Sequence, residues 1–247
     1  MLLKKKNAVL TGCNRGIGKE ILEIFSKNGA NVFACIRSAD SNFINFTKYL
    51  EKKYKNKIYV IKNDLGNIKN LKKAADSILL KKLPIHILVN NAAIIHTALF
   101  QMTSIDKLRE IFEINFFAQT IFTQYILKSM MKNKNGSIIY ISSNSALDGN
   151  VGRSAYLSAK AALIAQSKVL SREVGHYNIR VNAIAPGLIN TDMMIDNTSE
   201  KVINEVKNLS SLKRVGKPEE IANVVLFLAS DLASHLTGQV IRVDGGV

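Results

Sequence analysis

The sequence is poor in several residue types, and each shortage excludes something. Its 247 residues include two cysteines, three prolines and no tryptophan. Two cysteines are too few for a disulfide framework, and no cluster of potential ligands has the spacing of a metal site, so we expect no metal. We interpret Cys13 and Cys35 as reduced thiols, which indicates a reducing, cytoplasmic compartment.

Long apolar runs are missing too. No segment approaches the ~20 apolar residues that a membrane-spanning helix needs. The opening segment MLLKKKNAVLTG carries charge but lacks the apolar stretch of a signal peptide. We therefore expect no association with a membrane.

Acidic residues are scarce: 19 Asp and Glu face 34 Lys and Arg, giving a net charge of +15 and a sequence pI near 9.8. Such a balance is compatible with an acidic partner, including nucleic acid. The lysines, however, are spread among asparagines and isoleucines, and no zinc-finger spacing or RNA-binding aromatic motif accompanies them. We favour a solvated lysine-rich surface and expect no nucleic acid partner; a DNA affinity as salt-dependent as that of dedicated binders would reverse this.

What the chain does have is a regular alternation of short β-rich runs with longer helical patterns. The runs are apolar throughout, as in strands that are covered on both faces. The alternation predicts an α/β fold, a doubly wound parallel sheet of Rossmann type with helices on both faces. Without a linker or repeat, residues 1–247 form one expected domain. The expected strands cover residues 7–12, 31–36, 59–64, 85–92, 137–143, 180–186 and 239–246.

Two expected helices are apolar on more than one face. One covers about 103–131, with a capping arrangement from Thr103 to Asp106, and the other covers about 155–174. A helix that only covers a sheet needs a single apolar stripe. We infer a subunit interface, with deep burial inside one subunit as the alternative.

A glycine-rich loop, TGCNRGIG at 11–18, follows the first strand and opens the first helix. Gly12, Gly16 and Gly18 allow a tight turn and close approach of a pyrophosphate, which would face the positive end of the helix. The second strand ends at Ile36-Arg37, where an acidic residue would favour NAD. Because Arg37 and Arg15 can both pair with a 2′-phosphate, we predict NADP(H).

Tyr156 and Lys160 are four residues apart on an expected helix, so their side chains share one face. A free phenol has a pKa of about 10, and a nearby ammonium lowers it, which would make Tyr156 a usable acid. Ser143 follows a strand and could hold a carbonyl, while Asn115 could fix a water linked to Lys160. A serine-hydrolase triad is disfavoured because the four histidines are scattered.

These motifs, with NNAA at 90–93 and APGLINTDM at 185–193, resemble the short-chain dehydrogenase/reductase family over essentially the whole chain. The closing segment is similar to 3-oxoacyl-[acyl-carrier-protein] reductases. The resemblance implies a homotetramer and a catalytic tetrad of Asn115, Ser143, Tyr156 and Lys160. The expected cofactor site consists of Gly12, Asn14, Arg15, Gly16, Ile17, Gly18, Arg37, Asp64, Leu65, Asn90, Ala92, Tyr156, Lys160, Pro186, Gly187, Ile189 and Thr191. Of these, Asp64, Asn90, Ile189 and Thr191 are implied by the resemblance alone.

The expected function is NADPH-dependent reduction of a carbonyl, with a 3-oxoacyl thioester on acyl carrier protein as the first substrate. Lys132 and Lys134 are candidate contacts for the acidic carrier near the pocket rim. Three departures keep other substrates open: NNAA replaces the family's NNAG, the next loop lacks an Arg-Asp pair, and Tyr177 stands where a basic residue is frequent. The alternatives are a sugar or another small ketone or alcohol as substrate, and a non-catalytic nucleotide-binding scaffold.

Overall fold

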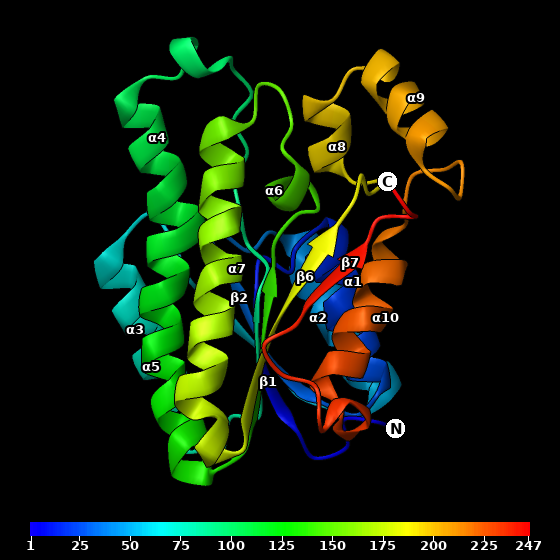
Figure 1. Ribbon diagram of the computed structural model, residues 1–247. Helices are drawn as coiled ribbons and strands as arrows, with labels where there is room; N and C mark the ends of the chain where they lie inside the picture. Colours follow the sequence, from blue (N-terminus) through cyan, green and yellow to red (C-terminus); the bar gives the residue numbers. More distant parts are fainter.

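The computed structural model describes all residues, 1–247, and confirms the α/β fold (Figure 1). Seven parallel strands form one sheet in the order β3-β2-β1-β4-β5-β6-β7. β2 and β3 lie on one side of β1, and β4 to β7 lie on the other side, so the strand order reverses between β1 and β4. The strands are β1 Asn7–Thr11, β2 Asn31–Ile36, β3 Ile58–Lys62, β4 Ile87–Asn90, β5 Gly136–Ile141, β6 Ile179–Pro186 and β7 Val240–Val243.

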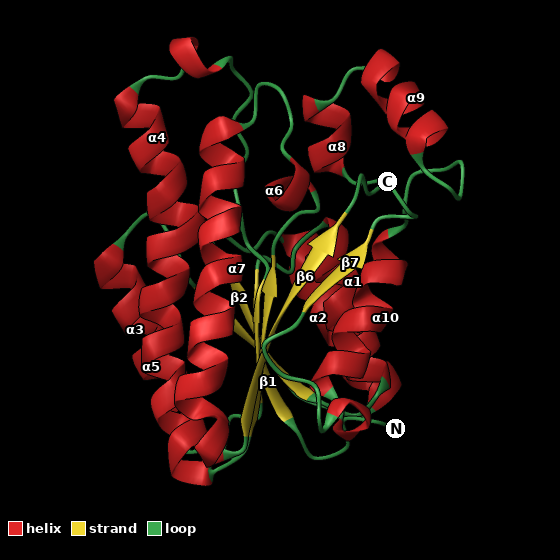
Figure 2. Cartoon of the chain, viewed as in Figure 1, coloured by secondary structure: helices red, strands yellow, loops and turns green.

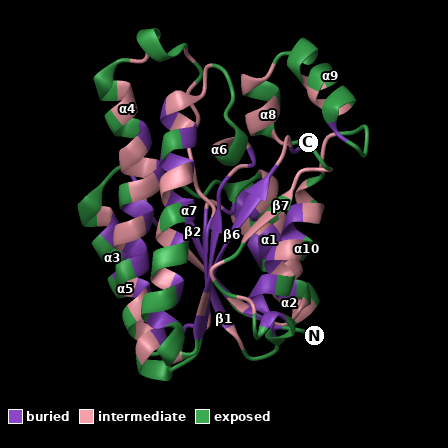
Figure 3. Ribbon diagram, in the orientation of Figure 1, coloured by how far each residue is buried: buried purple, intermediate pink, exposed green.

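Helices cover both faces of the sheet (Figures 1 and 2). On one face lie α1 Gly16–Lys27, α2 Ser41–Tyr54 and α10 Pro218–Ala229; on the other lie α3 Ile68–Leu79, α4 Ile105–Phe112, α5 Ala118–Asn133 and α7 Ser154–Val174. Successive strand residues alternate between two cores, one on each face, and both are apolar. The central strands are therefore buried throughout (Figure 3).

The two thiols belong to different cores. Cys13 packs in the core beneath α1, and Cys35 packs in the core beneath α3 and α5. Both are free and fully enclosed, and burial raises the pKa of each thiol well above its usual value. The sheet therefore separates them.

The long helix expected over 103–131 is interrupted. Between α4 and α5, residues Glu113–Phe117 form one π-helical turn, η2. The cap also differs from the expectation: the Ser104 hydroxyl accepts a hydrogen bond from the Lys107 amide at 3.2 Å. Thr103 is not the cap because its hydroxyl donates to the Leu99 carbonyl at 3.2 Å, closing the short helix η1 Phe100–Met102.

Three short helices stand beyond the carboxyl ends of the strands: α6 Ser145–Asp148, α8 Asp192–Asn197 and α9 Glu200–Leu209 (Figure 1). The short helices η3 Gly175–Tyr177 and η4 Asp231–Ala233 lie at the other end of the molecule. None of the helices is both long and apolar enough to cross a membrane. No three His, Cys, Asp or Glu side chains gather where they could hold a metal ion.

Candidate active site

A cavity of about 1040 Å³ opens at the carboxyl ends of the strands, under α6, α8 and α9. Its walls come from the loops after β1, β2, β3, β4, β5 and β6. The reversal of strand order between β1 and β4 lies at its floor, which is where open α/β sheets bind ligands. Two halves can be distinguished, one over the glycine loop and one beside the first turn of α7.

The glycine loop is held against the end of β4 by a set of hydrogen bonds. The Asn91 amide nitrogen Nδ2 donates to the carbonyls of Thr11 at 3.1 Å and Gly12 at 2.9 Å. The backbone amides of Asn91 and Ala92 both donate to the Thr11 hydroxyl. The N-terminal amides of α1 are thereby placed at the cavity, where they can bind phosphate.

Gly12 and Gly18 are required by this close approach. Gly12 has a φ of +67°, and a Cβ there would lie 2.8 Å from the Cα of Ala92. A Cβ on Gly18 would overlap the carbonyl oxygen of Gly12. The cradle therefore fits a pyrophosphate that approaches the backbone itself, as in dinucleotide sites.

Of the residues assigned to the cofactor from the sequence, all but one line the cavity: Gly12, Asn14, Arg15, Gly16, Ile17, Gly18, Arg37, Asp64, Leu65, Ala92, Tyr156, Lys160, Pro186, Gly187, Ile189 and Thr191. Asn90 is the exception, and the expectation that its side chain lines the cofactor site is corrected. Its side chain is completely buried, and its Nδ2 donates to the Thr123 hydroxyl of α5 at 2.9 Å. Because side chains alternate along a strand, its neighbour Asn91 reaches the cavity instead.

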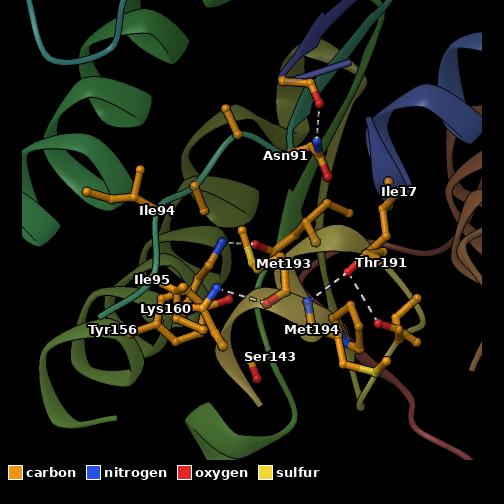
Figure 4. Close-up of a pocket in the computed structure, with 18 of the residues that line it drawn as sticks. Ile17, Asn91, Ile94, Ile95, Ser143, Tyr156, Lys160, Thr191, Met193 and Met194 are labelled. Atoms are coloured by element: carbon orange, nitrogen blue, oxygen red, sulfur yellow. Dashed lines mark hydrogen bonds between the residues drawn. The ribbon is translucent and has the colours of Figure 1, made fainter. Parts of the chain in front are cut away.

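Ser143, Tyr156 and Lys160 come together in the cavity (Figure 4). Ser143 follows β5, and the other two lie on α7, with Lys160 Nζ 5.7 Å from the centre of the Tyr156 ring. Lys160 is fully buried, and its ammonium donates to the Ile141 carbonyl at 2.6 Å. The buried Ser142 hydroxyl in turn donates to the Lys160 carbonyl, fixing the helix to the strand.

The expected lowering of the Tyr156 pKa is not what the structure shows. Burial raises the Tyr156 pKa to about 12 and lowers the Lys160 pKa to about 7. Both shifts have one cause, because removal from water disfavours the charged form of each group. The charge that does lower the Tyr156 pKa, against the larger effect of burial, belongs to Arg153.

Asn115 is placed differently from the other three catalytic candidates. It lies in the π turn, fully buried, and its carboxamide is paired with the backbone of Ile94. Ile94 N donates to Asn115 Oδ1 at 2.9 Å, and Asn115 Nδ2 donates to Ile94 O at 2.8 Å. The side-chain carboxamide thus positions the cavity-lining segment after β4, and a water held by Asn115 beside Lys160 stays a prediction.

Gln119, one turn further along, supports the same segment by donating to the Ala92 carbonyl at 2.7 Å.

The far half of the cavity is closed by α8 and α9, whose lining is largely apolar: Met193, Met194, Val202, Val206 and Leu209. Figure 4 shows Met193 and Met194 on the segment that crosses the site from Thr191. Thr191 caps α8 by accepting a hydrogen bond from the Met194 amide. The sequence predicts Thr191 in the site but none of these apolar residues, because their pattern resembles that of any amphipathic helix.

Lys132 and Lys134 do not lie near the rim. They come at the end of α5, just before β5 begins, whereas the cavity lies where β5 ends. A six-residue strand separates the two places, which corresponds to about 20 Å. Tyr177, just before β6, also lies at that opposite end.

Arg153, by contrast, lines the cavity three residues before Tyr156 and was missed. No local pattern marks Arg153, because its contact in the site is with the distant Asn197 carbonyl.

Comparisons with known proteins agree with this architecture. A family model described as enoyl-(acyl carrier protein) reductase matches residues 12–247. The chain is 38% identical over 245 residues to 3-oxoacyl-[acyl-carrier-protein] reductase of Aquifex aeolicus, covering 99% of this chain and 98% of that one. A solved structure described as a short chain dehydrogenase/reductase family protein superposes with a TM-score of 0.87, at 29% identity over 100% of this chain and 98% of that one.

A second structure superposes with a TM-score of 0.92 at 28% identity, covering 99% of this chain and 97% of that one. It is described as a candidate NAD(P)-dependent gluconate 5-dehydrogenase from Beutenbergia cavernae with NADP bound at low occupancy.

Proposed function

The chain belongs to the short-chain dehydrogenase/reductase family, and on that premise we propose that it is an NADPH-dependent ketoreductase acting on a 3-oxoacyl thioester carried by acyl carrier protein. One observation carries the chemistry: a single cavity joins the glycine cradle for a pyrophosphate to Ser143, Tyr156 and Lys160. A non-catalytic scaffold would not need these three side chains beside a nucleotide site.

NADPH, when bound over the glycine loop, supplies the hydride for the carbonyl carbon. Ser143 orients the carbonyl by donating a hydrogen bond to its oxygen. Tyr156 then gives its phenolic proton to the same oxygen, and its raised pKa keeps that proton in place at neutral pH. Lys160, when protonated, stabilises the phenolate that remains.

The preference for NADP over NAD rests on charge. Arg15 and Arg37 line the same cavity from adjacent loops and form no salt bridge with the chain. A 2′-phosphate would therefore meet two available guanidinium groups. Asp40, the acidic residue nearest after β2, is already occupied, because its carboxylate caps α2 by accepting from the Phe43 amide at 2.7 Å.

The carrier-linked substrate is supported by the relatives and by charge. The Aquifex protein is named for an acyl-carrier-protein substrate. The net charge of +15 would attract an acidic carrier over long range, and the apolar α8–α9 lining suits an acyl chain. The gluconate 5-dehydrogenase likeness supports a ketosugar as the second candidate.

A direct test compares NADPH consumption on three substrates: a 3-oxoacyl group on acyl carrier protein, the same group on a small thiol, and a ketosugar. We expect the carrier substrate to have the highest kcat/KM at low salt and to lose its advantage at high salt. If neither thioester is turned over while the ketosugar is, the fatty-acid assignment is wrong.

We also propose a homotetramer in the cytoplasm. The outer face of α4, the π turn and α7 carries apolar side chains that one subunit leaves half-exposed or exposed, including Phe117 and Val169. The rings of Phe112, Phe116 and Phe117 cluster there. Pairing of these helices across a two-fold axis would cover them. Light scattering should give four times the 27.3 kDa chain mass, and a stable monomer at micromolar concentration contradicts the assembly.

A further inference from the structure

The substrate half of the cavity contains a cation that the catalytic scheme does not use. Arg153 stands at the start of α7, in the position just before its first residue, and its side chain is half-buried in the cavity wall. One guanidinium nitrogen, Nη2, donates to the Asn197 carbonyl at the end of α8, at 2.7 Å. The guanidinium therefore bridges the catalytic helix and the helix that covers the site.

The second nitrogen of the group has no such partner. Arg153 Nη1 is enclosed, and no acceptor of the chain lies within hydrogen-bonding distance. No carboxylate pairs with Arg153 in any of the salt bridges. Asp148, an acid in the same cavity wall, is neutralised by Arg242 at 2.7 Å. Arg153 therefore lines the cavity as a cation without a counter-ion of the chain, and an oxygen of a bound substrate could accept a charge-assisted hydrogen bond from its guanidinium.

The position of Arg153 relative to Tyr156 defines which substrate oxygen can accept a hydrogen bond from the guanidinium. Arg153 precedes Tyr156 by three residues, and both residues line the same cavity. The Arg153 charge acts on the Tyr156 phenol, as the direction of its effect on the Tyr156 pKa shows. A substrate whose ketone oxygen reaches Tyr156 would thus bring a neighbouring oxygen toward Arg153.

We propose that Arg153 is a substrate-binding residue that takes the second oxygen of a 1,3-dicarbonyl substrate, the carbonyl or carboxylate oxygen on the carbon two positions from the ketone carbon. Both a 3-oxoacyl thioester and a free 3-oxo acid have this oxygen. The inference rests on the proposed ketoreductase function and narrows it, because it predicts selection against ketones that lack the second oxygen.

The experiment measures kcat/KM with NADPH on an acetoacetyl group attached to a small thiol, on acetoacetate, and on a monoketone of the same chain length. The variants are R153Q, which keeps a polar side chain but removes the charged guanidinium group, and R153K, which keeps the positive charge but not the guanidinium geometry. Arg180→Gln is the matched control. Arg180 is also half-buried, donates to one carbonyl, that of Ser230 at 3.1 Å, and has an enclosed Nη1 without an acceptor, but it lies at the opposite end of the sheet.

We expect R153Q to lower kcat/KM for the dicarbonyl substrates by about 10- to 100-fold, mainly through KM, as for loss of a hydrogen bond to a charged group. The monoketone should change by less than about threefold, since its binding does not use the second oxygen. R153K should retain more activity on acetoacetate than R153Q does, because a carboxylate still meets a cation. Arg180→Gln should leave the ratio between substrates unchanged. Equal losses on all three substrates, or no loss, would overturn the proposal.

Thermal unfolding and NADPH binding establish that each variant is folded; if R153Q is not, R153K must show a selective loss on the acetoacetyl thioester relative to the monoketone. A wild-type protein that reduces acetoacetate but no thioester, on the small thiol or on acyl carrier protein, refutes the carrier-linked function and leaves Arg153 to be judged on acetoacetate alone. If no carbonyl is turned over, the ketoreductase function fails. The inference is then decided by calorimetry: 3-hydroxybutyrate should bind the NADP⁺ complex of the wild type and not that of R153Q, and equal binding by both overturns it.

Discussion

The two halves of the large cavity are built on different principles. Over the glycine loop, the wall is mainly backbone, held in place by Thr11 and Asn91 and by glycines that admit no side chain. Around Tyr156 and under α8 and α9, the wall is mainly side chains, and single contacts such as Arg153 to Asn197 join one helix to another.

The difference shows how recognition divides between the halves. A backbone cradle binds what all dinucleotides share, their pyrophosphate, and tolerates almost no change. A side-chain wall can be altered residue by residue, which suits discrimination among carbonyl substrates. Substitutions should therefore act on chemistry and selectivity in the substrate half, and on cofactor binding and stability in the cofactor half.

The largest effect is expected from Tyr156→Phe in the substrate half. Removing the phenolic proton should lower kcat by about 10²–10⁴-fold, while NADPH binding measured by fluorescence titration stays near wild type. Tyr140→Phe is the control, because Tyr140 is also buried with a pKa raised to about 12, but its hydroxyl bonds Thr123 away from the cavity. Near-normal turnover in a folded Tyr156→Phe protein would show that another group is the acid.

In the cofactor half, Gly18→Ala should cost both stability and affinity. The added methyl group would overlap the Gly12 carbonyl, which cannot move without breaking the bond from Asn91. We expect about 1–3 kcal/mol of destabilisation, typical of overpacking, together with weaker NADPH binding. Gly175→Ala has open space around the new methyl group and should be neutral. Denaturant melts and cofactor titrations that do not distinguish the two variants would contradict the tight cradle.

Arg37→Asp probes selectivity within the cofactor half. Replacing the guanidinium by a carboxylate should reduce kcat/KM with NADPH by roughly 10-fold, as for one charge-assisted contact, and leave or improve the value with NADH. Arg172→Asp makes the same charge change on an exposed position of α7 and should alter neither. Equal use of NADPH and NADH by the unmodified protein would remove the basis for the NADP assignment.

A smaller, graded effect should come from Lys160, whose pKa is lowered to about 7 by burial, from a usual value of 10.5. Between these values the unfolded chain binds a proton that the folded chain lacks, so stability contributed by this group rises with pH, by at most about 1.4 kcal/mol per pH unit. Lys160→Met should be less pH-dependent than wild type from pH 7 to 9 in the cofactor-free state. Parallel unfolding curves for the two proteins over that range would argue against a depressed pKa.

In the cofactor half, the glycine loop could be predicted from the residues themselves because its requirement is local, whereas Asp64, Ile189 and Thr191 were assigned only through the family resemblance. A strand, a tight turn and a helix N-terminus restrict the backbone so strongly that glycine appears at fixed places in the sequence. Asn90 shows the limit of that argument: the motif places an asparagine pair at the end of β4, but the pleat decides which of the two faces the cavity.

In the substrate half, the sequence predicted Ser143, from its place after a strand, and the Tyr156–Lys160 pair, because i, i+4 spacing along one helix is itself local. Arg153 acquires its role from Asn197, 44 residues away, and Asn115 from Ile94, 21 residues away. Lys132 and Lys134 precede the strand that leads to Ser143, yet the direction of β5 carries them to the opposite end of the sheet.

By itself, then, the sequence determined the doubly wound parallel sheet, the glycine cradle and the shared face of Tyr156 and Lys160, since each follows from periodicity or backbone freedom within a short segment. Tertiary structure alone decided the pKa shifts of Tyr156 and Lys160 and the pairing of Asn115 with the segment after β4. Tertiary structure also decided that Arg153 Nη1 is buried without a hydrogen-bond acceptor. The physical reason is that desolvation and hydrogen bonding depend on which distant segments come into contact, and a local sequence pattern does not indicate those contacts.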